Sequence, residues 1–135
     1  MERIAAPLTA VGRVLIAALF LWDAALSFED IGGSIGYVAT GLPLPELAFW
    51  AAMAVQIAGG LALVAGFMTR WAALALALYC LATALFFHTH WADLDMKIHF
   101  FKNLAIAGGL VALAASGGGA WSWDARRGLS KEPFL

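Results

Sequence analysis

The sequence has 135 residues, of which 63% are apolar and only 13% are charged, and its mean hydropathy is +0.85. Soluble domains are about 45–50% apolar and about 25% charged, and a chain this short buries only about two-thirds of its surface on folding, so we expect lipid to solvate the excess. The formal net charge of −1 argues against a nucleic-acid partner, and a single cysteine, Cys80, excludes an internal disulfide.

Four apolar stretches are long enough to cross a bilayer, since about 20 helical residues span a hydrocarbon core of roughly 30 Å. They run from about residue 8 to 28, 47 to 67, 71 to 87 and 99 to 115. Helices are expected because lipid offers the backbone no hydrogen-bond partners. We therefore predict an all-α integral membrane protein, a four-helix bundle with short loops that forms a single domain over residues 1–135.

The first stretch is too long for the apolar region of a secretory signal, so we interpret it as an uncleaved anchor. Orientation follows from the basic residues, which are enriched on the cytoplasmic side. On one side of the four-span arrangement fall Arg3, Arg13, Arg70, Arg126, Arg127 and Lys131, and on the other only Lys97 and Lys102. Both termini are therefore predicted to be cytoplasmic.

The connections between the spans differ in length. Residues 29–46 separate the first two spans, and their middle, residues 33–40, is predicted to form a short helix on the outer surface. Residues 66–70 form a tight turn that makes the second and third spans antiparallel neighbours. Residues 116–135 are expected to be a short, mobile cytoplasmic tail.

Several polar residues are predicted to lie at one level near the outer face. Ionisable residues at membrane depth are functional hypotheses by default. With a rise of about 1.5 Å per residue, Asp23 of the first span and Lys102 of the fourth lie at similar depth and are candidate partners. His88 ends the third span, and His99, Lys102 and Asn103 share one helical face. These five residues predict a polar pocket. In the alternative interpretation, a charge pair only fixes helix register, or Lys102 extends to the interface.

The other polar groups in the spans are interpreted as packing residues. Gln56 precedes Gly59 and Gly60 on one stripe, where small residues let helices approach and an amide can bond across the contact. The Gly108-Gly109 pair is interpreted in the same way. Arg13 lies close enough to the inner interface to reach lipid phosphates. Ligand contact by Gln56 remains the alternative.

The segment between the third and fourth spans is rich in potential metal ligands. His88, His90 and His99 accompany Asp93 and Asp95 within a dozen residues, and such groups can bind zinc, copper or iron. Their spacing matches no specific signature such as the helical H-E-x-x-H. We assign no metal, and the three histidines remain only weak candidates.

The chain resembles the DoxX family of small bacterial inner-membrane proteins over residues 11–124. The resemblance is carried by seven short segments; no single one is diagnostic, but the order and spacing of the seven together are. The segments are GRVL at 12–15, LFLW at 19–22, GLPLP at 41–45, QIAGGLAL at 56–63, GFMTR at 66–70, ATALFFH at 82–88 and FKNLA at 101–105. The family often has Glu where this chain has Gln56, and Ser-Lys where it has Ser27-Phe28; these departures remove two charges on which a family role could depend.

The resemblance implies a multi-pass protein of the bacterial inner membrane. It also implies an association with quinone-linked sulfur oxidation, terminal oxidases or membrane redox assemblies, although many members have no defined activity. We therefore expect a quinone as a possible cofactor or ligand. We also expect a possible partner subunit in a membrane redox system and a possible homo-oligomer.

An apolar bundle with a polar pocket suits a quinone, whose carbonyls need a few donors while its tail prefers lipid. We therefore expect an accessory or quinone-interacting component of a membrane redox system. Aromatic stacking surface beside the pocket is expected from Trp22, Trp91, Phe100 and Phe101. The alternatives are a non-enzymatic membrane adaptor or assembly protein and a small oligomeric transporter.

Overall fold

The computed structural model describes residues 2–128, and all regular structure in this part of the chain is helical. The helices are α1 (Glu2–Glu29), α2 (Ile31–Ala39), α3 (Pro45–Ala65), α4 (Thr69–Phe87), α5 (Leu94–Ser116) and α6 (Trp123–Arg126). Four of them are long and apolar enough to cross a membrane. The predicted all-α membrane bundle is therefore confirmed.

The fourth span begins earlier than the sequence indicates. Asp93 caps α5, because its carboxylate accepts a hydrogen bond from the backbone N–H of Asp95 at 2.9 Å. The helix therefore starts at Leu94, and His99 lies one turn inside it instead of opening it. An N-cap aspartate followed by polar residues hides this start from a search for apolar runs.

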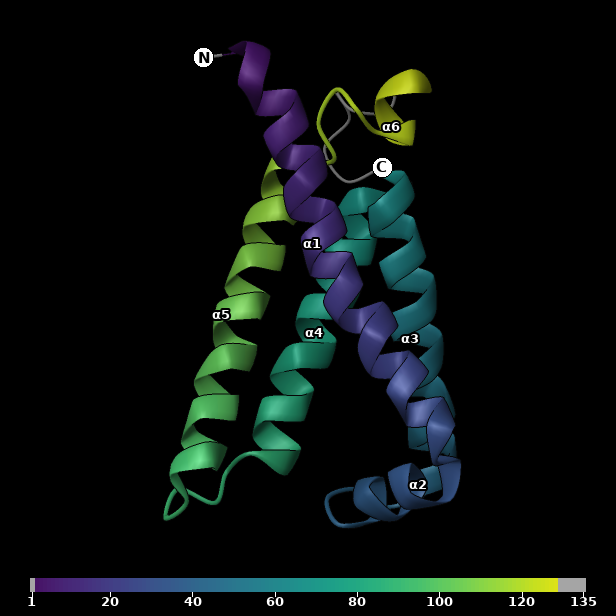
Figure 1. Ribbon diagram of the computed structural model, residues 1–135, viewed down its shortest axis with the longest axis vertical. Coiled ribbons are helices and arrows are strands. Elements are labelled where there is room, and N and C mark those ends of the chain that lie inside the picture. Colours follow the sequence, from purple (N-terminus) through teal and green to yellow (C-terminus); the bar gives the residue numbers. More distant parts are fainter. Residues whose placement is uncertain (1, 129–135) are drawn as a thin grey trace.

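The predicted surface helix between the first two spans is present as α2. Asp30 caps it by accepting a hydrogen bond from the backbone N–H of Gly33 at 2.9 Å. In Figure 1, α2 lies at one end of the molecule, across the direction of the spans. α3 then begins with Pro45, a residue that suits the first turn of a helix because it needs no N–H partner there.

The four spans are arranged as two pairs that diverge toward the end where α2 lies. α1 packs on α3, α4 packs on α5, and α3 and α4 join the pairs. Figure 1 shows the pairs close together near the α3–α4 turn and separated at the opposite end. The main core, which includes Leu63, Leu76 and Leu110, lies where the helices are close. The opposite end is left open.

Two glycines of α3 let its neighbours approach closely, as expected. A Cβ added to Gly59 would lie 2.9 Å from the Leu76 side chain of α4, and one added to Gly60 would lie 2.9 Å from Leu21 of α1. Gly108 and Gly109 serve no such contact within the described chain, since Cβ atoms added to them would meet nothing within 4 Å among residues 2–128. That part of α5 faces away from the bundle in the single chain.

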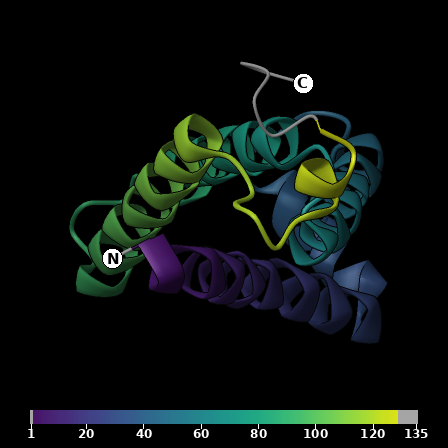
Figure 2. The ribbon, with the colours of Figure 1, turned by 90° about the horizontal axis from the view of Figure 1, so that it is seen from above.

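The C-terminal segment does not behave as a mobile tail over the described residues. Residues 117–128 fold back onto the α3–α4 turn, where the Asp124 carboxylate accepts hydrogen bonds from the backbone N–H groups of Met68 at 2.8 Å and Thr69 at 2.9 Å. The segment crosses the space between the end of α5 and this turn in Figure 2. Asp124 therefore caps α4 from outside that helix. Residues 129–135, and with them Lys131, lie outside the described residues.

Arg13 is a structural residue and does not reach lipid phosphates. Its side chain is only 2% exposed and donates hydrogen bonds to the carbonyls of Leu63 at 2.9 Å and Trp121 at 2.6 Å. It thereby satisfies the C-terminus of α3 and holds the C-terminal segment in place. A packing role for Arg13 was expected from the sequence. Its hydrogen-bond acceptors are the main-chain carbonyls of Leu63 and Trp121, which no sequence pattern identifies.

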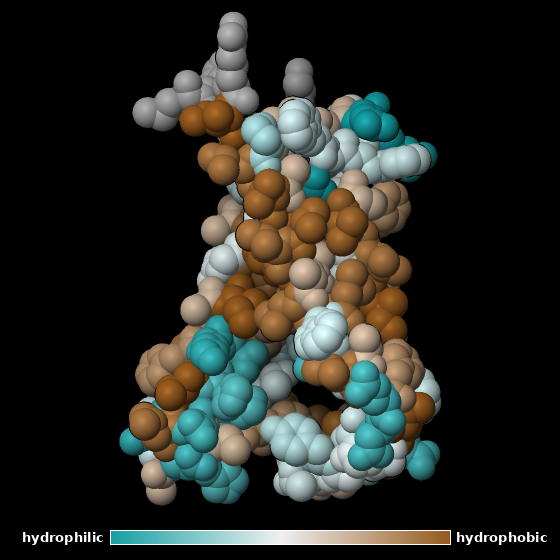
Figure 3. Space-filling view, viewed as in Figure 1, coloured by the Kyte–Doolittle hydropathy of each residue, from teal (hydrophilic) through white to brown (hydrophobic). Residues whose placement is uncertain are grey.

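The outer surface is that of a protein solvated by lipid. Figure 3 shows hydrophobic side chains across the middle of the molecule and hydrophilic ones toward the two ends. Large apolar residues such as Leu15, Leu78 and Leu85 are more than 60% exposed in the isolated chain. A soluble protein rarely exposes such continuous apolar area, so the bilayer is the expected surroundings.

Candidate functional site

A large cleft occupies the open end of the bundle. Its volume is about 1080 Å³, which is slightly above the range of about 300–1,000 Å³ typical of small-molecule sites. All four spans and α2 contribute to its wall. In Figure 3 the molecule is visibly hollowed in the corresponding lower half, with hydrophilic side chains on one rim. The cleft exists because the two helix pairs diverge while α2 lies across their ends.

All five residues predicted to form the polar pocket line this one cleft. They are Asp23 of α1, His88 at the end of α4, and His99, Lys102 and Asn103 of α5. Five residues chosen for their similar depth thus lie around one cavity. Depth does not give the distances between these residues across the cleft, because those distances depend on how far the two helix pairs diverge.

Asp23 and Lys102 are not directly paired. Within the described part of the chain, no ion pair joins the two side chains, although both line the cleft. They stand on α1 and α5, which belong to different pairs of the bundle. Similar depth alone does not bring two side chains into contact, because depth fixes only one of the three coordinates of a side chain.

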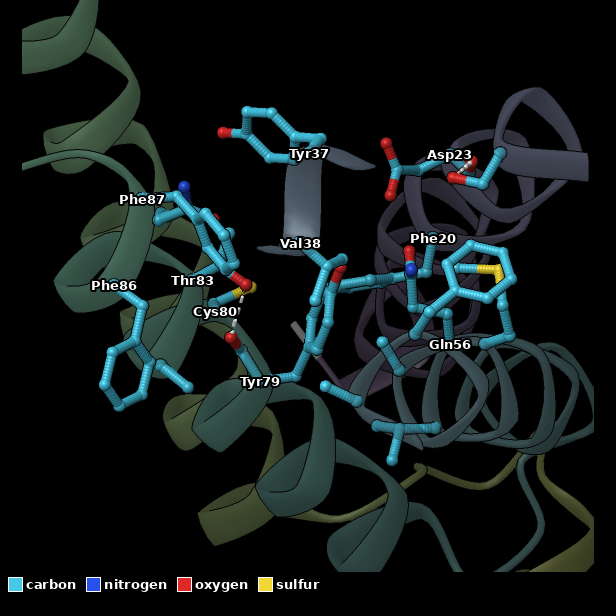
Figure 4. A pocket seen from close by; sticks show the side chains of 18 of the residues that line it. Phe20, Asp23, Tyr37, Val38, Gln56, Tyr79, Cys80, Thr83, Phe86 and Phe87 are labelled. Carbon is cyan, nitrogen blue, oxygen red and sulfur yellow. Dashed lines mark hydrogen bonds between the residues drawn. The ribbon is translucent and has the colours of Figure 1, made fainter. Parts of the chain in front are cut away.

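Gln56 is the polar group that the sequence interpretation underestimates. It is fully buried, and within residues 2–128 neither its amide nitrogen nor its amide oxygen has a hydrogen-bond partner. In Figure 4 its amide and the Asp23 carboxylate point into the same part of the cleft. No hydrogen bond of good geometry joins the two groups. An unpaired buried amide is costly, by about 1–3 kcal/mol, which is typical of a site that a ligand completes.

The aromatic surface of the cleft comes from residues other than those expected. Phe20 and Tyr79 pack edge to face with ring centroids 6.1 Å apart, and Tyr37 of α2 stacks on Phe87 of α4 at 5.1 Å. All four line the cleft, and Figure 4 shows them around its interior. The expected residues, which do not line it, are Trp22, Trp91, Phe100 and Phe101. A sequence shows which residues are aromatic but not which side of a lipid-embedded helix faces inward.

Two imidazoles form the rim of the cleft on the α4–α5 side. The rings of His88 and His99 are stacked, with centroids 5.3 Å apart and an interplanar angle of 25°. Burial, and secondly the proximity of His99, lowers the pKa of His88, and its Nδ1 atom is buried without a partner. His90 is exposed and does not line the cleft.

Metal binding gains no geometric support from this arrangement. Among residues 2–128, no three or more His, Cys, Asp or Glu side chains gather closely enough to hold a metal ion. The histidine-rich run is divided because α5 begins within it and Asp93 is used as a helix cap. The two imidazoles of that run that stack on each other are those of His88 and His99.

The fold and the cleft define a class: a small polytopic helical membrane protein with a polar, aromatic-lined cavity between its spans. Within this class the chain belongs to the DoxX family, whose family model matches residues 8–89. No solved structure shows significant similarity to the chain.

Two relatives in Escherichia coli strain K12 extend the similarity to most of the chain. The inner membrane protein YqjF is 36% identical over 118 residues, which cover 84% of this chain and 87% of the relative. The inner membrane protein YphA is 32% identical over 125 residues, which cover 86% of this chain and 87% of the relative. These relatives and the four apolar helices identify a multi-pass inner-membrane protein.

Proposed function

We propose that the cleft binds a quinone-type molecule and that the chain is an accessory, quinone-interacting component of a membrane redox system. The observation that supports this most directly is the buried, unpaired amide of Gln56 in an aromatic-lined cavity that Asp23 also lines. A quinone head has ring oxygens that need such partners, and its ring suits the aromatic walls.

The shape of the bundle is compatible with the rest of such a ligand. A quinone carries an apolar tail that must remain in contact with lipid or with apolar side chains. The two helix pairs diverge at this end, and α1 has no extensive contact with α5. A tail can leave the cleft between these helices, while His88, His99 and Lys102 lie at the rim, where the polar interface is expected.

The test is titration of the purified protein with a short-chain benzoquinone and the matching quinol. Gln56→Leu removes the unpaired amide at similar volume, and Lys102→Met removes the rim charge. Lys97→Met is the matched control, since Lys97 is exposed and does not line the cleft. We expect saturable binding that Gln56→Leu weakens roughly tenfold or more and Lys97→Met leaves unchanged. Equal affinity in all variants, or no saturable binding to the unmodified protein, rules out the proposal.

An adaptor role is the second candidate, and one observation favours it. Gly108 and Gly109 present open backbone on α5 with no neighbouring atoms, and small residues on a lipid-facing helix permit close docking of another helix. Gly109→Leu should then abolish copurification of a partner subunit or a second copy of the chain without changing quinone binding. Unchanged copurification would exclude docking through this part of α5.

A further inference from the structure

A second, smaller hollow lies at the other end of the molecule, between α3 and α6. Its volume is about 480 Å³, and in Figure 1 α6 lies beyond the α3–α4 turn, at the end away from α2. Its floor is formed by four residues of α3: Ala58, Leu61, Ala62 and Ala65. Its other wall is formed by two aromatic rings and a guanidinium group, those of Phe67, Trp123 and Arg127. We call this hollow the α3–α6 groove.

The floor of the α3–α6 groove is open to lipid. Its four residues are spaced i, i+3, i+4 and i+7, so they occupy one face of α3. The glycines at which α4 and α1 approach α3, Gly59 and Gly60, are not among them. Leu61 is 56% exposed, and Ala58 and Ala65 are exposed as well. Because alanine adds little side chain to the helix surface, this face of α3 is a shallow apolar track.

The polar end of the groove is held in place by the folded C-terminal segment. The backbone N–H of Asp124 donates to the carbonyl of Gly66 at 3.0 Å, and the Asp124 carboxylate caps α4. The backbone N–H of Arg127 donates to the carbonyl of Trp123 at 3.2 Å, so the two residues lie about one helical turn apart. Both side chains are exposed. Ordered backbone therefore presents an indole and a guanidinium beside the end of α3.

The exposed charge of this segment is positive. Arg13 and Arg70 donate to main-chain carbonyls within the bundle. Asp124, the acidic residue of the segment, is buried and serves as a helix cap. Arg126 and Arg127 are exposed and form no ion pair with another residue of the range 2–128. A guanidinium in this situation complements an anion, and its planar pair of donors fits a phosphate group.

From the order of apolar track, aromatic ring and cation we propose that the α3–α6 groove binds an anionic phospholipid from the bilayer leaflet on this side. One acyl chain lies along the alanine face of α3, the glycerol region contacts Trp123, and Arg127 donates to the phosphate. Tryptophan is typical of the headgroup level, and basic residues at that level attract anionic lipids. A second apolar helix would match the track but would leave the guanidinium without an anion. The groove is separate from the cleft, so this inference does not depend on the proposed function.

The size of the lipid preference follows from the single cation that lines the groove. One basic residue near the membrane surface typically strengthens the binding of anionic lipid about fivefold, and a paired contact of guanidinium with phosphate adds to this. We therefore expect phosphatidylglycerol to bind roughly fivefold to tenfold more tightly than phosphatidylcholine. The two lipids can be given identical acyl chains, so the comparison isolates the headgroup.

The test is native mass spectrometry of the full chain in detergent, titrated with each of these two lipids, to measure the dissociation constant of the first lipid bound. Arg127→Gln removes the cation and should abolish the preference for phosphatidylglycerol, whereas Arg127→Lys should retain part of it. Arg126→Gln is the matched control, since Arg126 is an exposed neighbour that does not line the groove, and it should retain the preference. Ala65→Phe fills the apolar track and should weaken the binding of both lipids.

Three results would overturn the inference. The first is equal affinity of the unmodified protein for the two lipids, which decides the question without any variant. The second is an equal loss of preference in Arg126→Gln and Arg127→Gln, since the source would then be the overall positive charge of this end. The third is a dimer of the chain that Ala65→Phe abolishes while lipid binding is unchanged, since the occupant would then be a second copy. None of the substituted residues lines the cleft, so quinone binding should be the same in all variants.

Discussion

Replacing Asp124 by alanine removes the side chain that connects the C-terminal segment to the start of α4. Asp124 is only 4% exposed, and its carboxylate accepts from two backbone N–H groups, those of Met68 and Thr69. These donors belong to the helix terminus, which has no intrahelical partners for them. The variant removes the protein acceptor of both N–H groups.

The expected loss of stability follows from these contacts. Removing an N-cap typically costs about 0.5–2 kcal/mol, and each hydrogen bond to a charged acceptor contributes about 1.5–3 kcal/mol. Since water can partly replace the carboxylate at the surface of the turn, we expect Asp124→Ala to lower the free energy of unfolding by about 2–4 kcal/mol. Asp124→Asn keeps one acceptor oxygen and should lose about half of that.

The matched control is Asp93→Ala. Asp93 also caps a span, but it is exposed and accepts a single hydrogen bond, from the N–H of Asp95. Its loss should cost about 0.5–1 kcal/mol. Both variants are measured by reversible unfolding in mixed detergent micelles, followed by circular dichroism. If Asp124→Ala and Asp93→Ala have the same effect, the C-terminal segment does not stabilise α4 and the reasoning fails.

Three further predictions concern the topology and the cleft. With both termini cytoplasmic, an impermeant thiol reagent applied from outside should label Gly36→Cys but not Arg127→Cys in a background lacking the native thiol; the reverse pattern would invert the orientation. Because Asp23 and Lys102 are not paired, the effects of Asp23→Asn and Lys102→Met on unfolding should add within about 0.5 kcal/mol, and a larger coupling energy would show that they interact. The pKa of His88 is lowered on folding by burial and by the neighbouring imidazole, so its contribution to stability is complete above the ordinary value of 6.5 and is lost as the pH falls below it. His88→Gln should flatten the decline in stability between about pH 7 and pH 5; an unchanged pH profile would contradict this.

The sequence alone indicated most of what depends on distance along a helix, although not the residue at which α5 begins. Apolar runs of sufficient length predicted four spans, because the thickness of the bilayer sets the length of a spanning helix. The constant rise per residue predicted that Asp23, His88, His99, Lys102 and Asn103 share one level, and all five line one cleft. Depth is a local quantity, so it can be counted from the sequence.

The tertiary structure decided what depends on how the helices lie beside one another. In lipid the outward faces of the helices are as apolar as the inward ones. The periodicity of apolar residues therefore does not show that the side of α4 with Tyr79, or the side of α3 with Gln56, faces a cavity. Asp23 and Lys102 stand on different pairs of the bundle and form no ion pair within residues 2–128, although both line the cleft. The caps made by Asp124 and Arg13 join segments that are 55 and 50 residues apart. Such contacts result from packing across the whole bundle, and no local pattern encodes them.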